Sequence, residues 1–265
     1  MKTYLSLFRV RFLNNLQYRG AALGGLTTQV FWGLMLVFIY AAFYRGGNGN
    51  IPFSALVSIV WLQQAFLAFV FLYDWDDELI TMITNGGISY ELCRPVHLYP
   101  IWYMKLLSKR AARGLLRFAP IIVLGFCMPA PYTLMPPDGP VAFVLFLVSM
   151  SLGLLLICAM SMLIYISIFK TLSPSGSIGI ITIIGEFFSG LTIPIPLMPD
   201  WLQRACEALP FRYVADLPFR VYTGLIGTAN ALTGIGLQIL WIVILVALGA
   251  YCMHRVSKLS VVQGG

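Results

Sequence analysis

Charged residues are scarce in this chain of 265 residues, where 17 Lys and Arg and 10 Asp and Glu amount to only 10%. An ordinary soluble domain carries roughly 25% charged residues, whereas 59% of this chain is hydrophobic. The apolar residues form about six runs, each near the length that crosses a bilayer as a helix. Too few polar residues remain for a separate soluble domain. The composition excludes a soluble enzyme and predicts an all-α integral membrane protein with six transmembrane helices.

Motifs for nucleotide binding, hydrolysis and metal binding are also missing. Because no Gly-Lys pair occurs, the chain lacks a P-loop, and we expect it not to hydrolyse ATP itself. The only histidines, His97 and His254, belong to no His-Glu-x-x-His pattern, and no Gly-x-Ser-x-Gly sequence is present. The five cysteines are scattered singly, without the pairing of metal sites. The sequence therefore predicts no catalytic residue, cofactor or metal ligand.

Apolar runs separated by glycine, proline and charged residues define the expected spans. Residues 1–20 place Leu5, Phe8 and Phe12 at helical spacing among basic residues, which is typical of an N-terminal helix lying in the membrane interface. No cleavage site follows this basic start, so we expect the first span to stay in the mature protein. The predicted spans are Ala21–Tyr44, Pro52–Tyr73, Phe118–Leu134, Val141–Phe169, Gly176–Leu197 and Ile235–Met253.

The distribution of Lys and Arg predicts how the spans are oriented. We treat residues 21–265 as one six-span domain with a long polar loop at 74–117 and a second polar segment at 198–231. Six spans place both termini and the loop at 74–117 on one side, which carries 13 of the 17 basic residues. By the positive-inside rule, both termini are cytoplasmic. The net charge of +7 is then an orientation signal rather than a surface for nucleic acid.

Polar residues inside the predicted spans are candidates for lining a pathway. Glu186 is the single acidic residue within a span, and we take it and the adjacent Phe187 and Phe188 as candidates for lining the pathway. A carboxyl at that depth should face the bundle interior and be protonated or paired. Glu186 then lines a translocation path or a proton-sensitive gate, or it only hydrogen-bonds a neighbouring helix. Gln63 and Gln64 leave the same two readings open, substrate contact or interhelical hydrogen bonding.

The loop at 74–117 contains an apolar stretch beside a flexible pair of glycines. Its apolar members are Ile80, Met82, Ile83, Tyr90 and Leu92, and they alternate with Asn85, Gly86, Gly87 and Ser89. A short helix with exposed apolar groups next to a hinge suits docking into a groove of another protein. An interfacial helix resting on lipid is the alternative, and composition does not separate the two.

Two stretches of the chain carry a family pattern. The first is Gly86-Gly87-Ile88-Ser89-Tyr90-Glu91-Leu92-Cys93-Arg94-Pro95-Val96. The second runs from Phe188-Ser189-Gly190-Leu191 through Pro194 and Pro199 to Leu209-Pro210-Phe211-Arg212-Tyr213, then Pro218, Arg220 and Tyr222-Thr223-Gly224. Both stretches, and the topology of the whole chain, resemble the type-2 export permeases of ATP-binding-cassette (ABC) transporters. The similarity is to the six-span permeases of the viologen and natural-product exporter group, and Glu186 belongs to neither pattern.

The resemblance implies that several subunits share the work of transport. Two permease subunits, identical or homologous, would form a twelve-span pathway, and two copies of a separate ATPase holding ATP and Mg would bind beneath it. The stretch from Ile80 to Arg94 would be the cytoplasmic coupling helix, with ATPase contacts at Ile83, Gly86, Gly87, Tyr90, Leu92, Arg94 and Pro95. The external segment before the last span would form re-entrant helices and a gate, with candidates Pro194, Pro196, Pro199, Trp201, Pro210, Phe211, Arg212 and Arg220.

The expected function is therefore that of the permease subunit of an ATP-driven exporter in the bacterial inner membrane. Its substrate would be a drug-like molecule, a peptide or a natural product. One alternative is a non-transporting assembly factor or sensor that binds a partner through the same loop. Another is a proton-coupled secondary transporter that uses Glu186, although no inverted repeat is evident in the sequence.

Overall fold

The computed structural model of the chain is helical throughout, and no strand occurs among the residues that it describes. These are residues 2–17, 19–47, 49–72, 75–88, 91, 93, 96–171 and 174–260. The α-helices are α1 (Lys2–Leu16), α2 (Arg19–Arg45), α3 (Phe53–Ala65), α4 (Leu67–Val70), α5 (Asp77–Thr84), α7 (Leu98–Cys127), α8 (Pro140–Thr171), α9 (Pro174–Phe188), α10 (Asp200–Ala208), α11 (Asp216–Tyr222) and α12 (Thr228–Ser260). Two short 3₁₀ turns, η1 (Ile195–Leu197) and η2 (Pro210–Tyr213), flank α10.

Within the part of the chain that the structure describes, three helices are long and apolar enough to cross a membrane. The candidate spans are Leu23–Arg45 in α2, Pro140–Phe169 in α8 and Thr228–Ser257 in α12. They coincide with the first, fourth and sixth spans expected from the sequence. Large apolar side chains stay exposed along them, including Phe31 at 65% and Val243 at 60%. Exposed apolar surface of this extent is typical of helices that face lipid, which supports an all-helical membrane protein.

The second and fifth predicted spans are represented by shorter apolar helices. The second begins as α3 and is interrupted after 13 residues, before the single turn of α4. The fifth, α9, ends at Phe188, and the chain then turns at Gly190, whose φ of +82° favours glycine. At a rise of 1.5 Å per residue, helices of 13 and 15 residues measure about 20 Å and 22 Å, less than the roughly 30 Å of hydrocarbon.

The third predicted span has different bounds from those expected. One helix of 30 residues, α7, begins at Leu98 inside the predicted loop and ends at Cys127, so the expected span Phe118–Leu134 includes seven residues beyond the helix. Residues 98–117 form the first part of α7, and their basic side chains have partners on neighbouring elements. Because these charges are paired, the amphipathic first part of the helix packs in the bundle and continues directly into the apolar second part. Pro120 lies inside the helix and removes one backbone donor from it.

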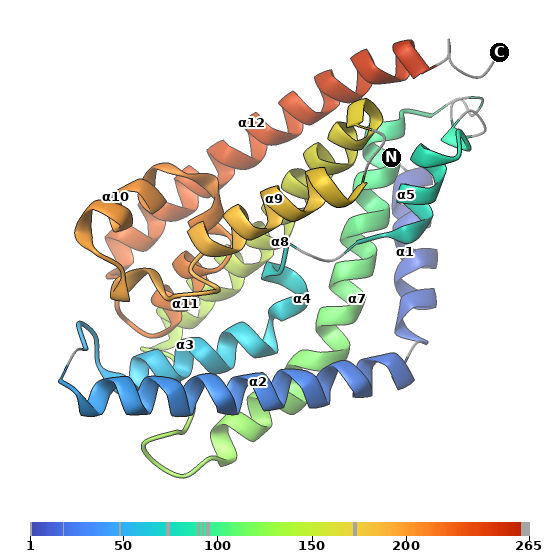
Figure 1. Cartoon of the computed structure of the whole chain (residues 1–265). Coiled ribbons are helices and arrows are strands. Elements are labelled where there is room, and N and C mark those ends of the chain that lie inside the picture. Colours follow the sequence, from blue (N-terminus) through green and yellow to red (C-terminus); the bar gives the residue numbers. More distant parts are fainter. Residues whose placement is uncertain are drawn as a thin grey trace.

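Helix α8 is the centre of the fold, because it packs against α12, α11, α7, α9, α4 and α5. Its inner face contributes fully buried residues to the main core, among them Leu156 and Tyr165. Trp61 on α3 and Trp102 on α7 are also completely buried in this core. The arrangement places α2 and α3 along one side of the bundle and α9 and α12 along the other (Figure 1).

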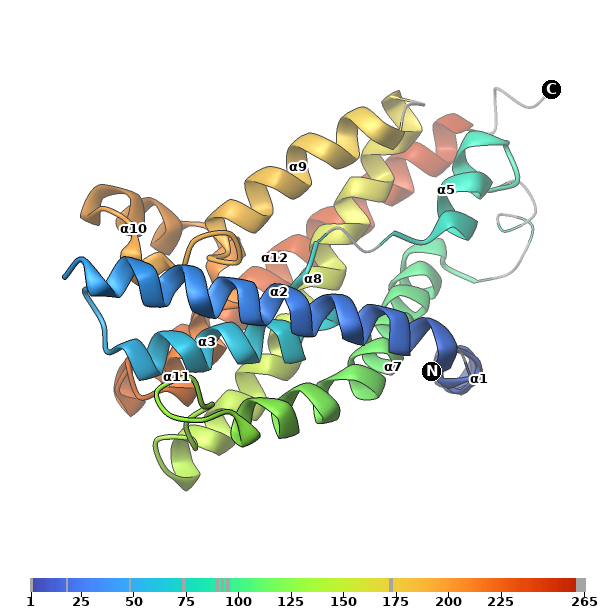
Figure 2. The same cartoon turned by 60° about the horizontal axis from the view of Figure 1, so that its bottom comes forward.

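The polar elements gather at the two ends of the bundle. Helix α1, α5 and the C-terminal end of α12 lie at one end in both views (Figures 1 and 2). The turn between α2 and α3 lies at the opposite end, together with α10 and α11. Helix α5 from the long polar loop and helices α10 and α11 from the later polar segment therefore lie at opposite ends of the bundle.

Candidate functional site

The first candidate region is the short helix α5 and the acidic residues that begin it. The Asp76 carboxylate caps the helix by accepting hydrogen bonds from the backbone N–H groups of Glu78 and Leu79, at 3.1 and 3.4 Å. Leu79 and Ile83, four residues apart on one face, are buried in the core. Thr81 and the end of the helix remain exposed. The cap and the apolar face explain why this segment of a predicted loop is helical.

Ion pairs tie α5 to α1 and α7. The Arg11 guanidinium donates two hydrogen bonds to the Glu78 carboxylate, at 2.6 and 2.8 Å, and the Lys105 ammonium lies 3.3 Å from the same group. Lys105 is only 6% exposed and also lies 3.7 Å from Glu91. The hydrogen bonds from Arg11, aided by the charge of Lys105, lower the pKa of Glu78 to about 2. Glu78 therefore stays ionised and joins three helices.

A second set of contacts connects the start of α5 to α8. The backbone N–H of Asp76 donates a hydrogen bond of 2.7 Å to the Tyr165 hydroxyl on α8. Lys109 of α7 lies 3.5 Å from the Asp76 carboxylate and donates a hydrogen bond to the Trp75 carbonyl. The Trp75 ring also packs edge-on against that of Tyr165. Helix α5 is thus held by charged or polar contacts to α1, α7 and α8.

The residues predicted to contact an ATPase are placed unequally. Ile83 is 5% exposed and packs inward, so its side chain is not on the surface. Gly86 is exposed with a φ of +70°, and a Cβ on Gly87 would meet nothing closer than 3.7 Å. The remaining candidates lie outside the described residues; they are Tyr90, Leu92, Arg94 and Pro95.

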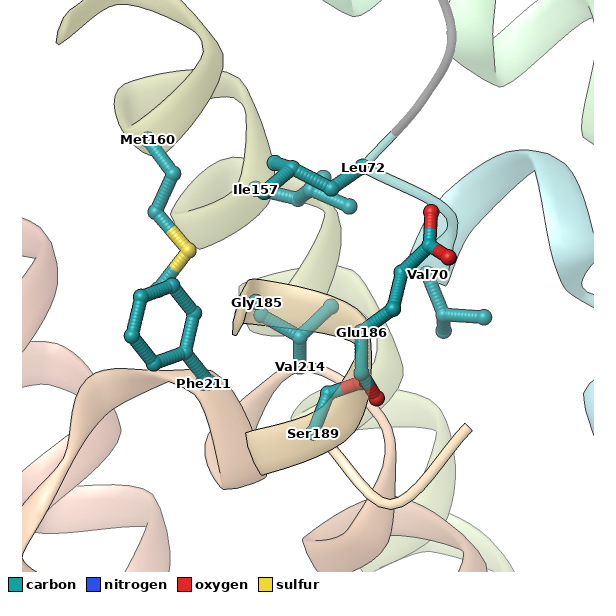
Figure 3. A pocket seen from close by; sticks show the side chains of 9 residues that line it. All are labelled: Val70, Leu72, Ile157, Met160, Gly185, Glu186, Ser189, Phe211 and Val214. Carbon is teal, nitrogen blue, oxygen red and sulfur yellow. The ribbon is translucent and has the colours of Figure 1, made fainter. Parts of the chain in front are cut away.

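The second candidate region surrounds Glu186, whose side chain is half-buried on α9 (Figure 3). It lines a small cavity with apolar neighbours from three other segments of the chain: Val70, Leu72, Ile157, Met160, Phe211 and Val214. Gly185 and Ser189 complete the lining. The cavity has a volume of about 10 Å³, which is room for about one water molecule. Among the residues that the structure describes, this cavity is therefore too small for a substrate to pass through it.

The two adjacent glutamines of α3 point to different neighbours. Gln63 is 4% exposed, and its amide donates a hydrogen bond of 3.0 Å to the Gly190 carbonyl just after α9. Gln64, 6% exposed, instead packs toward Gly33 of α2, where a Cβ would lie 3.1 Å from its Cγ. Successive residues on a helix point about 100° apart, so this divergence follows from the geometry. Of the pair, the structure brings only Gln63 near the end of the helix that carries Glu186.

Phe187 and Phe188 pack toward the segment that follows α9. Their rings meet edge to face, with centroids 5.4 Å apart, and both pack against a small separate cluster of Ile195, Met198 and Cys206. Pro194 and Pro196 are buried beside this cluster, and Pro199 precedes the first residue of α10. The two phenylalanines therefore anchor α10 to α9, and they do not line the cavity beside Glu186.

Two of the candidates for an external gate, Arg212 and Arg220, take part in an ionic cluster around the buried Asp216. Arg212 on η2 lies 2.9 Å from Glu207 and 3.6 Å from Asp216, and Arg220 lies 3.5 Å from the same aspartate. Burial raises the pKa of Asp216, although both guanidinium groups oppose that change. Pro210 begins η2, and the next residue, Phe211, reaches the Glu186 cavity. Trp201, in contrast, points outward with 70% of its surface exposed.

Two buried polar residues were missed by the sequence interpretation. Gln238 on α12 is fully buried, donates hydrogen bonds of 2.8 Å to the Ser149 and Tyr213 carbonyls, and accepts one from the Ser149 hydroxyl. Arg110, counted from the sequence only as a loop charge, is 1% exposed and donates to the Ala68 and Phe71 carbonyls at the end of α4. A lone polar residue in an apolar run was the available signal for Gln238.

Neither metal ligands nor similar proteins give a further indication of function. Among the residues that the structure describes, no three His, Cys, Asp or Glu side chains come together as metal ligands. Comparisons of the chain with protein-family models, with curated proteins and with solved structures find no match.

Proposed function

We propose that the chain is the transmembrane permease subunit of an ATP-driven ABC exporter. Two permease subunits, identical or homologous, would assemble with two separate ATPase subunits that bind ATP and Mg. The bacterial inner membrane is the location, both termini are cytoplasmic, and a drug-like molecule, a peptide or a natural product is the substrate class. The two sequence stretches that resemble type-2 export permeases are the origin of this proposal.

The observation that carries the proposal is the attachment of α5. This helix lies at the end of the bundle with α1 and the C-terminal end of α12, and polar contacts join it to three helices (Figures 1 and 2). A force applied to its exposed residues would reach α8, the centre of the fold, through Asp76 and Tyr165. A protein without ATPase chemistry of its own needs such an attachment to respond to a partner.

In the six-span topology of this proposal, α3 and α4 together form the second span, α7 forms the third and α9 forms the fifth. Support comes from the ends of the bundle, where the predicted cytoplasmic and external segments are separated (Figure 1). The breaks after α3 and α9 suit membrane depth because the backbone there is enclosed by protein. The Gln63 side-chain amide, for example, donates a hydrogen bond to the Gly190 carbonyl just after α9.

The small volume of the cavity at Glu186 favours a pathway between two permease subunits. A volume of about 10 Å³ holds no exported molecule, so a passage within one chain would require its helices to separate. A passage between two copies would not need the main core to open. In this proposal the segment from Pro194 to Arg220 closes that passage from outside.

Purification of the tagged chain with its bound partners tests the proposal. We expect an ATPase to copurify in equal amount, and candidate substrates to stimulate its activity. Recovery of the chain without an ATPase would refute the exporter and favour the assembly factor or sensor. Transport that persists without ATP hydrolysis but stops with Glu186→Gln would favour the proton-coupled alternative.

Substitution on the exposed face of α5 then locates the contact. Thr81 is exposed on α5, and Thr81→Trp should reduce ATPase copurification at least tenfold because a bulky ring prevents close docking. The matched control is Thr192→Trp, which changes an exposed threonine between α9 and η1. Equal recovery of ATPase with both variants would overturn the docking role of α5.

A further inference from the structure

A groove between the beginning of α7 and the last turns of α12 contains both histidines of the sequence. Its volume is about 430 Å³, and it is lined by Val96, His97, Leu98, Tyr99 and Pro100 on one side and by Val246, Ala250, Met253, His254 and Ser257 on the other. The two histidines are exposed, whereas Tyr99 and Met253 are buried. The imidazoles therefore lie at the rim of the groove and the tyrosine lies deeper.

The polar groups in this groove suit a negatively charged ligand. Tyr99 is 7% exposed, and its buried hydroxyl has no hydrogen-bond partner among the residues that the structure describes. An unpaired buried hydroxyl costs about 1–3 kcal/mol, so a ligand oxygen that accepted its hydrogen bond would be favoured. His97 is the residue immediately before α7, and the first backbone N–H groups of a helix have no partner within it and attract anions. None of the ten lining residues is acidic.

The apolar part of the groove gives a second constraint on the ligand. Val246, Ala250 and Met253 follow one another at helical spacing along α12, inside the candidate span Thr228–Ser257. His254 and Ser257 occupy the last turn of that span, which is the level of the lipid headgroups if α12 crosses the bilayer. The groove thus has polar groups at the level of headgroups and apolar walls at the level of acyl chains.

We propose that this groove binds an anionic phospholipid. Its phosphate accepts hydrogen bonds from the Tyr99 hydroxyl and from the imidazoles of His97 and His254, and its acyl chain lies against Val246 and Ala250. Tyr99 is the deepest polar contact, and its ring packs against α12 at Gly249. The packing is so close that a Cβ on Gly249 would lie 2.6 Å from Cε2 of Tyr99. This site does not depend on the exporter proposal, since it requires no ATPase.

Titration of the purified full-length chain in detergent, followed by native mass spectrometry, tests the proposal. Phosphatidylglycerol and diacylglycerol with identical acyl chains are the two probes, so that only the phosphate-containing headgroup differs. We expect phosphatidylglycerol to bind roughly tenfold more tightly, the effect of about one charge-assisted hydrogen bond. Equal affinity for the two lipids would overturn the proposal.

Matched variants locate the binding. Tyr99→Phe removes only the buried hydroxyl and should weaken phosphatidylglycerol binding about tenfold, whereas Tyr251→Phe, an exposed tyrosine of α12 outside the groove, should leave it unchanged. His97→Asn with His254→Asn alters only rim residues and should also abolish the preference for phosphatidylglycerol. This pair keeps the proposal testable if Tyr99→Phe fails to fold, and unchanged binding in properly folded variants would overturn it.

Competition separates a lipid from a free anion of the same chemistry. Inorganic phosphate and glycerol 3-phosphate at millimolar concentration should displace little phosphatidylglycerol, because they lack the acyl chains that contact Val246 and Ala250. Complete displacement by either small anion would refute the assignment to lipid.

Discussion

The contribution of Glu78 to the attachment of α5 is the most direct test of the structure. Glu78→Gln removes the negative charge that the guanidinium of Arg11 and the ammonium of Lys105 share, at 2.6 and 3.3 Å. Because the Glu78 side chain is 46% exposed, water screens both pairs, and exposed pairs contribute only about 0.2–1 kcal/mol each. We expect a combined loss of about 1 kcal/mol in the free energy of opening α5.

Amide hydrogen exchange measured by mass spectrometry reports that free energy locally. A loss of about 1 kcal/mol raises the exchange of the amides in α5 roughly fivefold, while peptides from the middle of α8 should stay unchanged. The control is Asp77→Asn, since Asp77 is the other exposed acid in the first turn of α5 and shares the favourable position at a helix N-terminus. Equal acceleration by both variants would refute a specific role for the ion pairs.

The same contacts predict a dependence on pH. The pKa of Glu78 falls from its ordinary value of 4.5 to about 2 in the folded chain. A carboxyl with a lowered pKa stabilises the folded state fully above its unfolded pKa, and this contribution is lost as protonation proceeds. Protection of α5 should therefore decrease between pH 4.5 and pH 2 in the wild type, and Glu78→Gln should lack that part of the decrease.

Two further predictions concern the packing of α12 and are measured by thermal unfolding in detergent. Gln238→Leu leaves the Ser149 and Tyr213 carbonyls without their buried donor and should cost about 2–4 kcal/mol of stability; an unchanged melting temperature would contradict the hydrogen-bond assignment. Gly249→Ala places a Cβ 2.6 Å from the ring of Tyr99 and should cost about 1–3 kcal/mol, whereas Gly236→Ala on the same helix has no neighbour within 4 Å. Equal melting temperatures for the two alanine variants would show that Tyr99 does not pack as described.

Hydropathy predicted the parts of the fold that face lipid. The spans at α2, α8 and α12 follow directly from long apolar runs, because their exposed surfaces must be apolar whatever the rest of the chain does. The limits of α7 could not be found in this way. Its first half is basic, and it becomes helical because Lys105, Lys109 and Arg110 find partners on α4, α5 and the segment before α5. Such partners are far apart in sequence and are visible only in three dimensions.

The sequence could indicate single residues of the candidate sites, but it could not show which of them lie together. Glu186 and Gln63 stood out because polar residues are costly inside a membrane span, and the structure gives both of them neighbours near the end of α9. The inward orientation of Ile83 could not be predicted, because an eight-residue helix can present either face to the core. For the same reason the meeting of His97 and His254 in one groove had no signal in the sequence, where 156 residues separate them.

The continuous helix α7 also has a mechanical consequence. At a rise of 1.5 Å per residue, its 30 residues form a rod about 45 Å long, with roughly three quarters of that length before Pro120. A helix bends most readily where proline removes a hydrogen bond, so Pro120 is a natural hinge. A sideways displacement of the basic part would then be absorbed largely as bending at Pro120, and the apolar part could keep its place in the bundle. The part before the hinge lies beside α1 and α5, and the part after it lies beside α2 and α3.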